Sequence, residues 1–307
     1  MYDVIIIGGG PAGLSAALAL GRACKRVLLC DAGPRRNAAA THVHNFVSRD
    51  GTPPAELRAI ARQQLAPYVD VEVREAPVER LAGSKGAFRA TVDGVEVEAR
   101  RAILCTGLID EMLPLDGFRE LWGHAIFQCP YCHGWEHRGQ AWGYLAREPE
   151  APHFPVFLRG WTRTLSYFTG GAFELPAEHR AQLEQAGVRV VTAPVRRLIA
   201  RGEPTAPTLD GLELASGEIV PCAALFVHPR QRQVDLVAAL GLAFEPDGTV
   251  SVDPMTHETS LPGVYAAGDL TTRAQGALLA AAAGLKAAGM LNHELTAELV
   301  ARGDAEV

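Results

Sequence analysis

Long apolar runs are missing from this sequence of 307 residues. No run reaches the roughly 18 residues that a membrane-spanning helix requires. The apolar start, residues 1–7, lacks a basic flank and leads directly into three glycines. It is therefore expected to form a buried strand rather than a signal segment. We predict no membrane partner and a cytoplasmic location.

Clusters of basic residues are also missing. The formal net charge is −6 and the calculated isoelectric point is about 5.9. Proteins that bind nucleic acid or anionic membranes usually gather lysine and arginine on one surface. The sequence therefore predicts no nucleic-acid partner.

A second pair of closely spaced cysteines is absent too. Cys129 and Cys132 are spaced C-x-x-C, and the others are isolated: Cys24, Cys30, Cys105 and Cys222. A zinc site usually needs two ligand pairs, and His42 and His44 have no nearby acid or third ligand, so we predict no metal site. The string C-x-x-C-H at 129–133 is also a haem c attachment signature, but that chemistry needs an exported chain. Two buried structural thiols remain an alternative; a redox-active disulfide is favoured.

The first residues predict a dinucleotide-binding turn. A β-branched strand at 3–7 is followed by G-x-G-x-x-G at Gly8, Gly10 and Gly13, and a helix is expected over 14–22. Glycines permit a tight turn, so that a pyrophosphate reaches the helix N-terminus. A second strand, 26–30, ends at Asp31, where a carboxylate would accept hydrogen bonds from a ribose.

The remaining pattern predicts an α/β protein. A helix is expected at 56–65, and strands at 69–74, 88–92 and 95–99, the last two joined by an Asp93-Gly94 turn. Buried strands at 101–107 and 263–269 each end in small residues, and a long alanine-rich helix follows at 277–299.

Four motifs in this order resemble the thioredoxin-reductase family of FAD-dependent disulfide oxidoreductases. They are G-G-G-P-A-G at 8–13, C-T-G at 105–107, C-P-Y-C at 129–132 and A-G-D at 267–269. The resemblance covers essentially the whole chain. It implies two Rossmann-like domains and a homodimer: a split FAD-binding domain, 1–111 and 238–307, and an inserted NAD(P)H-type domain, 112–237.

The resemblance also implies which residues bind FAD. The pyrophosphate is expected at Gly8, Gly10, Pro11, Ala12 and Gly13, and the adenosine ribose at Asp31. Val78 is expected at the adenine edge, with Thr106 and Gly107 along the dinucleotide. Further contacts are expected from Gly268, Asp269, Gln275, Gly276 and Ala277, and from Arg36 and Asn45 in a loop of variable length.

The inserted domain departs from the reductase pattern. A reductase resembling this chain would carry a second glycine fingerprint after the cysteines, but residues 139–150 hold none, and Glu148 and Glu150 would repel a pyrophosphate. The arginine cluster that would pair a 2′-phosphate is missing after Phe168. The domain is therefore predicted to be degenerate, without a nicotinamide site.

The residues after the cysteines depart as well. Reductases commonly continue C-x-x-C with aspartate, whereas here His133 follows, then Gly134, Trp135 and Glu136. The form C-x-x-C-H-G-[WY]-E resembles the dithiol oxidases that close disulfides in microbial natural products such as holomycin and gliotoxin. Histidine, with an ordinary pKa of about 6.5, exchanges protons near neutral pH.

The resemblance implies an FAD-dependent dithiol oxidase acting on a small-molecule dithiol. Cys129 would form the mixed disulfide with substrate, Cys132 would be the sulfur nearer the flavin, and His133 would be the base, with oxygen as the acceptor. Two other functions stay open: reduction of a thioredoxin-like protein with electrons from NADPH or another donor, and a flavin-containing redox sensor.

Overall fold

The computed structural model describes residues 1–33 and 35–303. The chain forms two compact units. The first unit comprises Met1–Ala38, Phe46–Asp110 and Gln231–Val307, and the second comprises Ala39–Asn45 and Glu111–Arg230. The split first unit and the inserted second unit resemble the expected division, but residues 39–45 join the second unit, and the chain returns to the first at Gln231 instead of residue 238.

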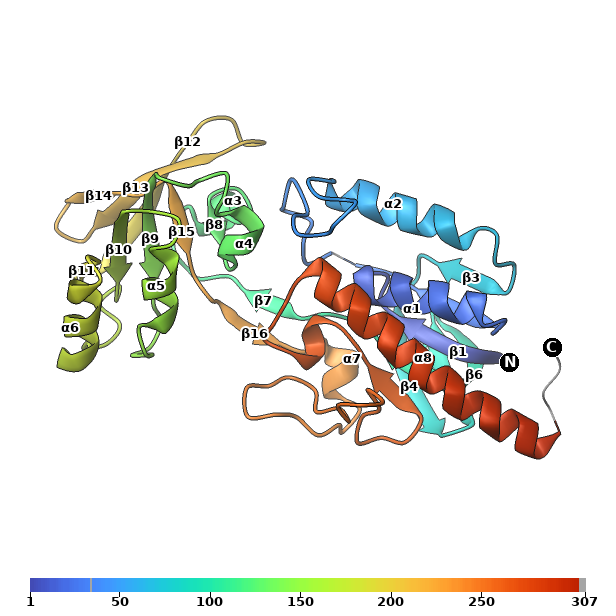
Figure 1. The fold of residues 1–307 in the computed structure, drawn as a ribbon. Coiled ribbons are helices and arrows are strands. Elements are labelled where there is room, and N and C mark those ends of the chain that lie inside the picture. The colour runs from blue at the N-terminus through green and yellow to red at the C-terminus, as the bar shows by residue number, and fades with distance from the viewer. Residues whose placement is uncertain (34, 304–307) are drawn as a thin grey trace. The chain divides into compact units, whose positions relative to one another are not determined.

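The first unit is built on a mixed sheet with strand order β3-β2-β1-β6-β5-β4, and β17 pairs with β6 (Figure 1). Its elements are β1 (Tyr2–Ile7), α1 (Pro11–Arg22), β2 (Val27–Cys30), α2 (Pro54–Leu65), β3 (Val71–Arg74), β4 (Val78–Ser84), β5 (Ala87–Val92), β6 (Val95–Leu104), α7 (Asp235–Ala238), β17 (Val264–Ala266), the 3₁₀ helix η1 (Asp269–Thr271) and α8 (Ala277–Arg302). The predicted α/β fold is confirmed.

Strand β6 unites two predicted strands. Its first half pairs antiparallel with β5, and its second half pairs parallel with β1 and β17. The sequence hid this continuity because the first half is polar and half-exposed, whereas the second half is buried on both faces. One strand therefore joins the hairpin to the parallel core that carries the glycine turn.

Helices α1 and α8 lie side by side over this sheet, although they come from opposite ends of the chain (Figure 1). A glycine sets how closely they approach: a Cβ atom at Gly284 of α8 would lie 2.0 Å from the backbone oxygen of Ala12. The face between helices and sheet is filled by aliphatic side chains such as Leu20, Leu291 and Leu295, each at most 1% exposed. Gly284, inside the continuous helix α8, thus serves helix packing.

The second unit has a parallel sheet of order β11-β10-β9-β15-β8 and an antiparallel sheet of order β12-β13-β14. Its elements are α3 (Phe118–Leu121), β8 (Ile126–Phe127), α4 (Pro130–His133), β9 (Ala141–Leu145), α5 (His153–Leu158), β10 (Thr164–Phe168), α6 (Ala177–Gln185), β11 (Arg189–Val191), β12 (Val195–Arg201), β13 (Thr208–Leu214), β14 (Ile219–Pro221) and β15 (Ala224–Phe226). Strands β7 (Ile109–Glu111) and β16 (Arg230–Arg232) pair where the chain crosses between units.

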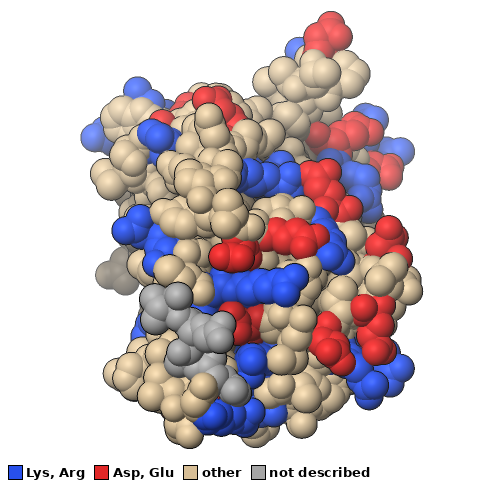
Figure 2. All heavy atoms as spheres, turned by 90° about the vertical axis from the view of Figure 1, so that its right-hand side faces the viewer, with Lys and Arg blue, Asp and Glu red and all other residues tan. Residues whose placement is uncertain are grey.

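Charges of both signs are interspersed on the face shown in Figure 2, where basic and acidic side chains alternate. Among residues 1–33 and 35–303, the structure contains no helix that is both long and apolar enough to cross a bilayer.

Candidate functional site

The glycine turn of the first unit is shaped for close approach of a ligand. Gly8 has φ +110°, a conformation that residues with a side chain rarely adopt. A Cβ atom at Gly13 would lie 1.8 Å from the Gly8 carbonyl oxygen, so this position has no room for a side chain either. Gly10, the residue that precedes α1, has ordinary extended dihedrals, and a Cβ atom there would meet no protein atom within 4 Å. This open space at the helix N-terminus fits a pyrophosphate.

Asp31 closes the same turn from the end of β2. Its carboxylate accepts a hydrogen bond of 3.2 Å from the backbone N–H of Gly9 and forms ion pairs of 2.9 Å with Arg35 and Arg62. A Cβ atom at Gly9 would lie 2.5 Å from the Asp31 carboxyl carbon. The glycine therefore admits the acid, and the contact of Asp31 with an adenosine ribose stays a prediction.

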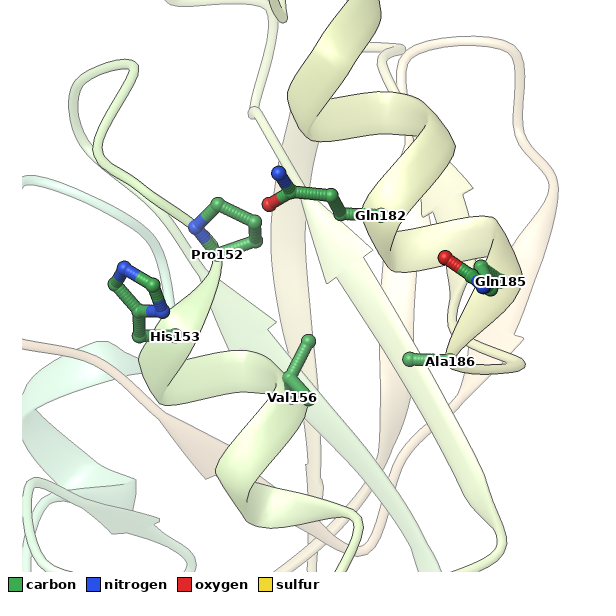
Figure 3. Close-up of a pocket in the computed structure, with 6 residues that line it drawn as sticks. All are labelled: Pro152, His153, Val156, Gln182, Gln185 and Ala186. Atoms are coloured by element: carbon green, nitrogen blue, oxygen red, sulfur yellow. The ribbon is translucent and has the colours of Figure 1, made fainter.

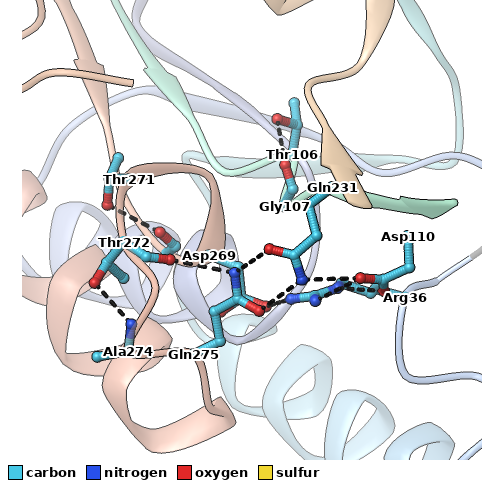
Figure 4. A network of polar contacts seen from close by, with 11 residues as sticks. Arg36, Thr106, Gly107, Asp110, Gln231, Asp269, Thr271, Thr272, Ala274 and Gln275 are labelled. Carbon is cyan, nitrogen blue, oxygen red and sulfur yellow. Dashed lines mark hydrogen bonds and ion pairs between the residues drawn. The ribbon is translucent and has the colours of Figure 1, made fainter. Parts of the chain in front are cut away.

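Arg36 organises a polar network in the first unit (Figure 4). Its guanidinium contacts Asp110 at 2.7 and 2.8 Å and Asp269 at 2.7 Å. Burial alone would lower the pKa of Arg36, but these two carboxylates raise it above its usual value. The Gln231 side-chain amide donates to Asp110 at 2.9 Å and exchanges hydrogen bonds of 3.1 and 2.9 Å with Gln275.

This network places several predicted cofactor residues together. Asp269 begins η1 directly after Gly268, whose φ is +96°, and Gln275 and Gly276 immediately precede α8, which begins at Ala277. Thr106 and Gly107 follow β6 in the same view (Figure 4), and Val78 begins β4 in the same sheet. The turn, the acid at the end of β2 and the α8 N-terminus together fit FAD.

Asn45 lies elsewhere. It belongs to the second unit, has φ +61°, and its side-chain amide donates a hydrogen bond of 2.7 Å to the backbone oxygen of Tyr131, between the two cysteines. The structure therefore brings Asn45 to the C-x-x-C segment, and its expected contact with the cofactor stays a prediction.

The C-x-x-C segment lies at the carboxyl edge of the parallel sheet of the second unit. Strand β8 ends at Phe127, and Cys129 precedes the short helix α4, which contains Cys132. Both cysteines are half-buried thiols in the structure. In doubly wound sheets, ligands bind outside the carboxyl ends of the strands, so the cysteines stand where this fold presents reactive groups.

Cys129 differs from the isolated cysteines in its acidity. A hydrogen bond from Cys132, assisted by the backbone N–H groups of Cys132 and Tyr131, lowers the pKa of Cys129 to about 7, although burial opposes this. Burial instead raises the pKa of Cys30 to about 11 and those of Cys105 and Cys222 to about 12. Because the thiolate is the reactive form, Cys129 is set apart chemically from these three buried thiols.

His133 follows Cys132 directly and stacks on Phe127, with ring centroids 4.3 Å apart. Its Nε2 atom is buried and has no hydrogen-bond partner among the described residues. Burial lowers the pKa of His133 to about 4, and the nearby charge of Glu136 offsets only part of that effect. The pKa of His133 in the folded structure therefore lies below the ordinary value of about 6.5, and the imidazole is neutral at pH 7. The role of His133 as a base stays a prediction.

Glu136 lies among several histidines. Its carboxylate is 3.6 Å from Nε2 of His44, and the rings of His42 and His44 are 6.0 Å apart. Among the described residues there is no group of three or more histidine, cysteine or acidic side chains placed to hold a metal ion. The arrangement surrounds His133 with polar groups from two segments.

Two buried tyrosines stand near the carboxyl ends of β9 and β10 in the second unit. Tyr144 of β9 is 1% exposed, and its hydroxyl donates to the carboxylate of Glu150. Burial, followed by that carboxylate, raises the pKa of Tyr144. Tyr167 of β10 is fully buried, and its hydroxyl has no partner among the described residues. No glycine cradle comparable to residues 8–13 follows β9.

A cleft of about 340 Å³ opens in the second unit between α5 and α6. Pro152, His153 and Val156 face Gln182, Gln185 and Ala186 across it (Figure 3). Its lining comes from the two helices rather than from strand ends, and it holds no arginine or lysine. It therefore lacks the features of a site for a phosphorylated nucleotide.

Sequence reasoning missed several polar residues of these sites. Asp110 and Gln231 complete the Arg36 network, and Tyr144 and His228 stand at the carboxyl edge of the second sheet. Each is a lone residue outside any motif, so periodicity gave no signal for it. For Asp110 alone, its place shortly after C-T-G was an available hint.

Comparison with known proteins agrees with this geometry. The family model described as "Pyridine nucleotide-disulphide oxidoreductase" matches residues 2–142 and 173–285. The chain is 30% identical to "Thioredoxin reductase sirT" of Leptosphaeria maculans, over 98% of this chain and 97% of that protein.

Two solved structures are similar across nearly the full length. An oxidoreductase from Agrobacterium tumefaciens is 40% identical with a TM-score of 0.88, covering 96% of this chain and 98% of that one. The structure of HlmI is 36% identical with a TM-score of 0.91, covering 98% and 95%. The protein therefore belongs to the pyridine nucleotide-disulphide oxidoreductase family, as an FAD-binding flavoenzyme of the thioredoxin-reductase type.

Proposed function

We propose that this protein is an FAD-dependent dithiol oxidase, which closes a disulfide in a small-molecule dithiol through Cys129 and Cys132 and passes the electrons to oxygen. The C-x-x-C-H-G-[WY]-E form of residues 129–136 supports this function, since it is shared with the natural-product dithiol oxidases that the sequence resembles. A homodimer and a cytoplasmic location stay predictions.

One observation carries the proposal. At the carboxyl edge of the second sheet, where a reductase would hold its nicotinamide nucleotide, the chain places the buried Tyr144 and the Glu150 carboxylate to which it donates. A pyrophosphate at that edge would meet a negative charge and no glycine cradle. Electrons are therefore expected to enter from a dithiol rather than from NADPH.

The first step consumes the Cys129–Cys132 disulfide of the oxidised enzyme. A substrate thiolate attacks the Cys129 sulfur, so a substrate–Cys129 bond forms as the Cys129–Cys132 bond breaks. Cys132 leaves as a thiolate. The exchange is electron-neutral overall, and its rate depends on how much of the attacking thiol is deprotonated.

The second step closes the product. The remaining substrate thiol attacks the substrate sulfur of the mixed disulfide, and Cys129 is the leaving group. Thiols of lower pKa leave faster. Once the Cys132 thiolate has taken up a proton, its hydrogen bond, together with the two backbone N–H groups, lowers the pKa of Cys129 to about 7. The enzyme then holds both electrons as a dithiol. FAD supplies the two-electron acceptor that reoxidises this dithiol when it is bound.

His133 accepts the proton of an attacking substrate thiol. Because burial lowers its pKa to about 4, the imidazole is neutral at pH 7 and its Nε2 atom is free of other described partners. A base of such low pKa holds the proton only briefly, which favours rapid return of the proton to a cysteine thiolate or to water.

Anaerobic mixing of the purified holoenzyme with dithiothreitol and, separately, with NADPH tests the proposal. We expect rapid loss of the oxidised flavin absorbance with dithiothreitol and slow or no loss with NADPH. Oxygen admitted afterwards should restore the absorbance and yield hydrogen peroxide. Fast, saturable reduction by NADPH would instead establish a thioredoxin reductase, the function in the name of the Leptosphaeria relative. Flavin that responds to neither reagent would favour a redox sensor.

A further inference from the structure

The crevice that binds nucleotides in other doubly wound sheets is linked here to the redox cysteines. In the order β11-β10-β9-β15-β8, chain order reverses between β9 and β15, and ligands bind at such a switch point. All four pairings in this sheet are parallel, so Tyr144 near the end of β9, His228 after β15 and Gln128 after β8 share one edge.

Contacts among these residues form a continuous chain. Tyr144 donates its hydroxyl proton to Glu150, and Nδ1 of His228 lies 3.5 Å from the same hydroxyl oxygen. Nε2 of His228 lies 3.2 Å from the backbone oxygen of Gln128. Phe154 packs edge-on against the imidazole, with ring centroids 4.5 Å apart. The chain ends on the carbonyl group that directly precedes Cys129.

The direction of each hydrogen bond follows from the available protons. A carbonyl oxygen only accepts, so Nε2 of His228 carries the proton in the bond to Gln128. The single Tyr144 hydroxyl proton goes to the Glu150 carboxylate, which also only accepts when ionised. A proton on Nδ1 would complete the chain, but the bond to Gln128 forms with or without it. The contact with the redox segment therefore does not depend on the charge of His228.

A second side chain holds the same segment from the other side of Cys129. The Asn45 amide donates to the Tyr131 backbone oxygen at 2.7 Å. Side-chain donors thus hold the carbonyl groups of residues 128 and 131, on either side of Cys129. The backbone N–H groups of Tyr131 and Cys132, which stabilise the Cys129 thiolate, lie within the stretch that these contacts fix.

We propose that His228, packed against Phe154 and beside the Tyr144–Glu150 pair, is a positioning residue that holds the Gln128 carbonyl and thereby sets Cys129 for thiol exchange. Tyr144, Glu150 and His228 thus stand at the sheet edge where other proteins of this fold bind a nucleotide, and here His228 contacts the segment that carries the two cysteines. The proposal rests on thiol exchange at Cys129 in the proposed function, but it is independent of the substrate and of the electron acceptor.

The decisive variants are His228→Leu, which removes both nitrogens, and His228→Gln, whose amide offers a donor near the position of Nε2. His293→Leu, on an exposed position of α8 in the first unit, is the matched control. Two measurements are made on each holoenzyme: the anaerobic single-turnover rate of flavin reduction by dithiothreitol, and the rate of iodoacetamide alkylation of Cys129 after reduction, located by tandem mass spectrometry.

We expect His228→Leu to slow flavin reduction by roughly 10- to 100-fold, the scale of a misplaced reacting group, with FAD content unchanged. Alkylation of Cys129 should slow several-fold at pH 7 and match the wild type at pH 10, where the thiolate no longer needs stabilisation. His228→Gln should recover most of both rates, and His293→Leu should behave as wild type.

Wild-type rates in His228→Leu would overturn the proposal, as would a His228→Gln variant as impaired as His228→Leu. The alkylation assay separates this failure from failure of the proposed function. If NADPH proves to be the electron donor, the oxidase function is lost, but Cys129 alkylation still reports whether His228 positions the cysteine.

Discussion

In each unit a buried central strand leads into a helix, and the turn between strand and helix differs between the units. In the first unit, β1 leads through the glycine turn into α1, a helix of 12 residues, with open space before Gly10. In the second unit, β9 leads through residues 146–152 into α5, a helix of 6 residues. There Glu150 accepts a hydrogen bond from the hydroxyl of Tyr144, which lies near the end of β9. Both units keep a parallel sheet, so we expect the chemistry of this turn to decide whether a dinucleotide binds.

The largest effect is expected at Cys129, which is half-buried in the second unit, whereas the cysteines at the strand ends of the first unit, Cys30 and Cys105, are buried. Cys129→Ser should reduce dithiol oxidation by about 10³-fold or more, since loss of a covalent nucleophile removes the whole exchange route. FAD content should not change, because the glycine turn lies in the first unit. Oxygen consumption with dithiothreitol and flavin absorbance measure the two effects.

The roles of the two cysteines are separated by trapping. Cys132→Ser should form a lasting mixed disulfide with 5,5′-dithiobis(2-nitrobenzoic acid) at Cys129, because the resolving thiol is gone. Cys129→Ser should react more slowly at Cys132. The opposite order of reactivity would reverse the assignment of Cys129 as the substrate-facing sulfur.

His133→Ala should slow dithiol oxidation by roughly 10²–10⁴-fold at pH 7, as expected for loss of a general base. The defect should shrink as the pH rises towards the pKa of the substrate thiol, because solution then supplies the thiolate. Full activity of the variant at pH 7, measured by oxygen uptake, would show that His133 only packs against Phe127.

His133 also predicts a dependence of stability on pH. Its pKa is lowered to about 4 in the folded state and is about 6.5 when unfolded. The unfolded chain binds more protons between these values, so stability is full above pH 6.5 and falls towards pH 4 by up to about 3 kcal/mol. His133→Phe, which keeps a ring against Phe127, should lose this share of the decline in urea unfolding.

Gly10→Val sharpens the contrast between the two turns. A side chain there meets no protein atom within 4 Å, so the apoprotein should keep its melting temperature within a few degrees, but the side chain would occupy the space of the pyrophosphate. We expect FAD affinity to fall by roughly 10-fold or more, as when about 1.4 kcal/mol is lost. Gly13→Ala, whose Cβ atom would lie 1.8 Å from the Gly8 oxygen, should destabilise even the apoprotein.

The smallest effect is expected from Tyr144→Phe. The substitution removes the hydroxyl that donates to Glu150 but preserves the ring packed against Phe154, whose centroid is 5.4 Å away. The loss of one hydrogen bond should cost about 0.5–1.5 kcal/mol in the free energy of unfolding. NADPH should still fail to reduce the flavin, because removing one hydroxyl creates no glycine cradle; recovered NADPH reduction would mean that Tyr144 alone blocks the nucleotide.

The sequence predicted what local pattern encodes. The strand, glycine turn and helix of residues 2–22 follow from apolar runs and the conformational needs of glycine, and β2 ends before Asp31 as expected. Contacts between residues far apart in the sequence could not be predicted from local pattern. Nothing local indicated that residues 39–45 belong to the second unit, that Asn45 bonds to Tyr131, or that Gln231 joins Asp110 across a separation of 121 residues.

The pKa of His133 shows the same limit in electrostatic terms. Its residue type is visible in the sequence. Its burial and its stacking on Phe127 depend instead on strand β8, which carries Phe127, and on Phe226 of β15, whose ring packs against that of Phe127. The pKa of His133 is therefore set by the packing around the side chain and cannot be read from the C-x-x-C-H motif.

The ion pair between Arg36 and Asp269 joins residues 233 positions apart, and α8 packs beside α1 over the same sheet (Figure 1). During synthesis, the first unit therefore cannot close until α8 has left the ribosome, whereas residues 111–230 form most of the second unit as one contiguous stretch. Non-local pairing of this kind is slow, and domains generally fold as units in the order of synthesis. The redox segment is thus expected to be in place before the flavin-binding unit that serves it can form.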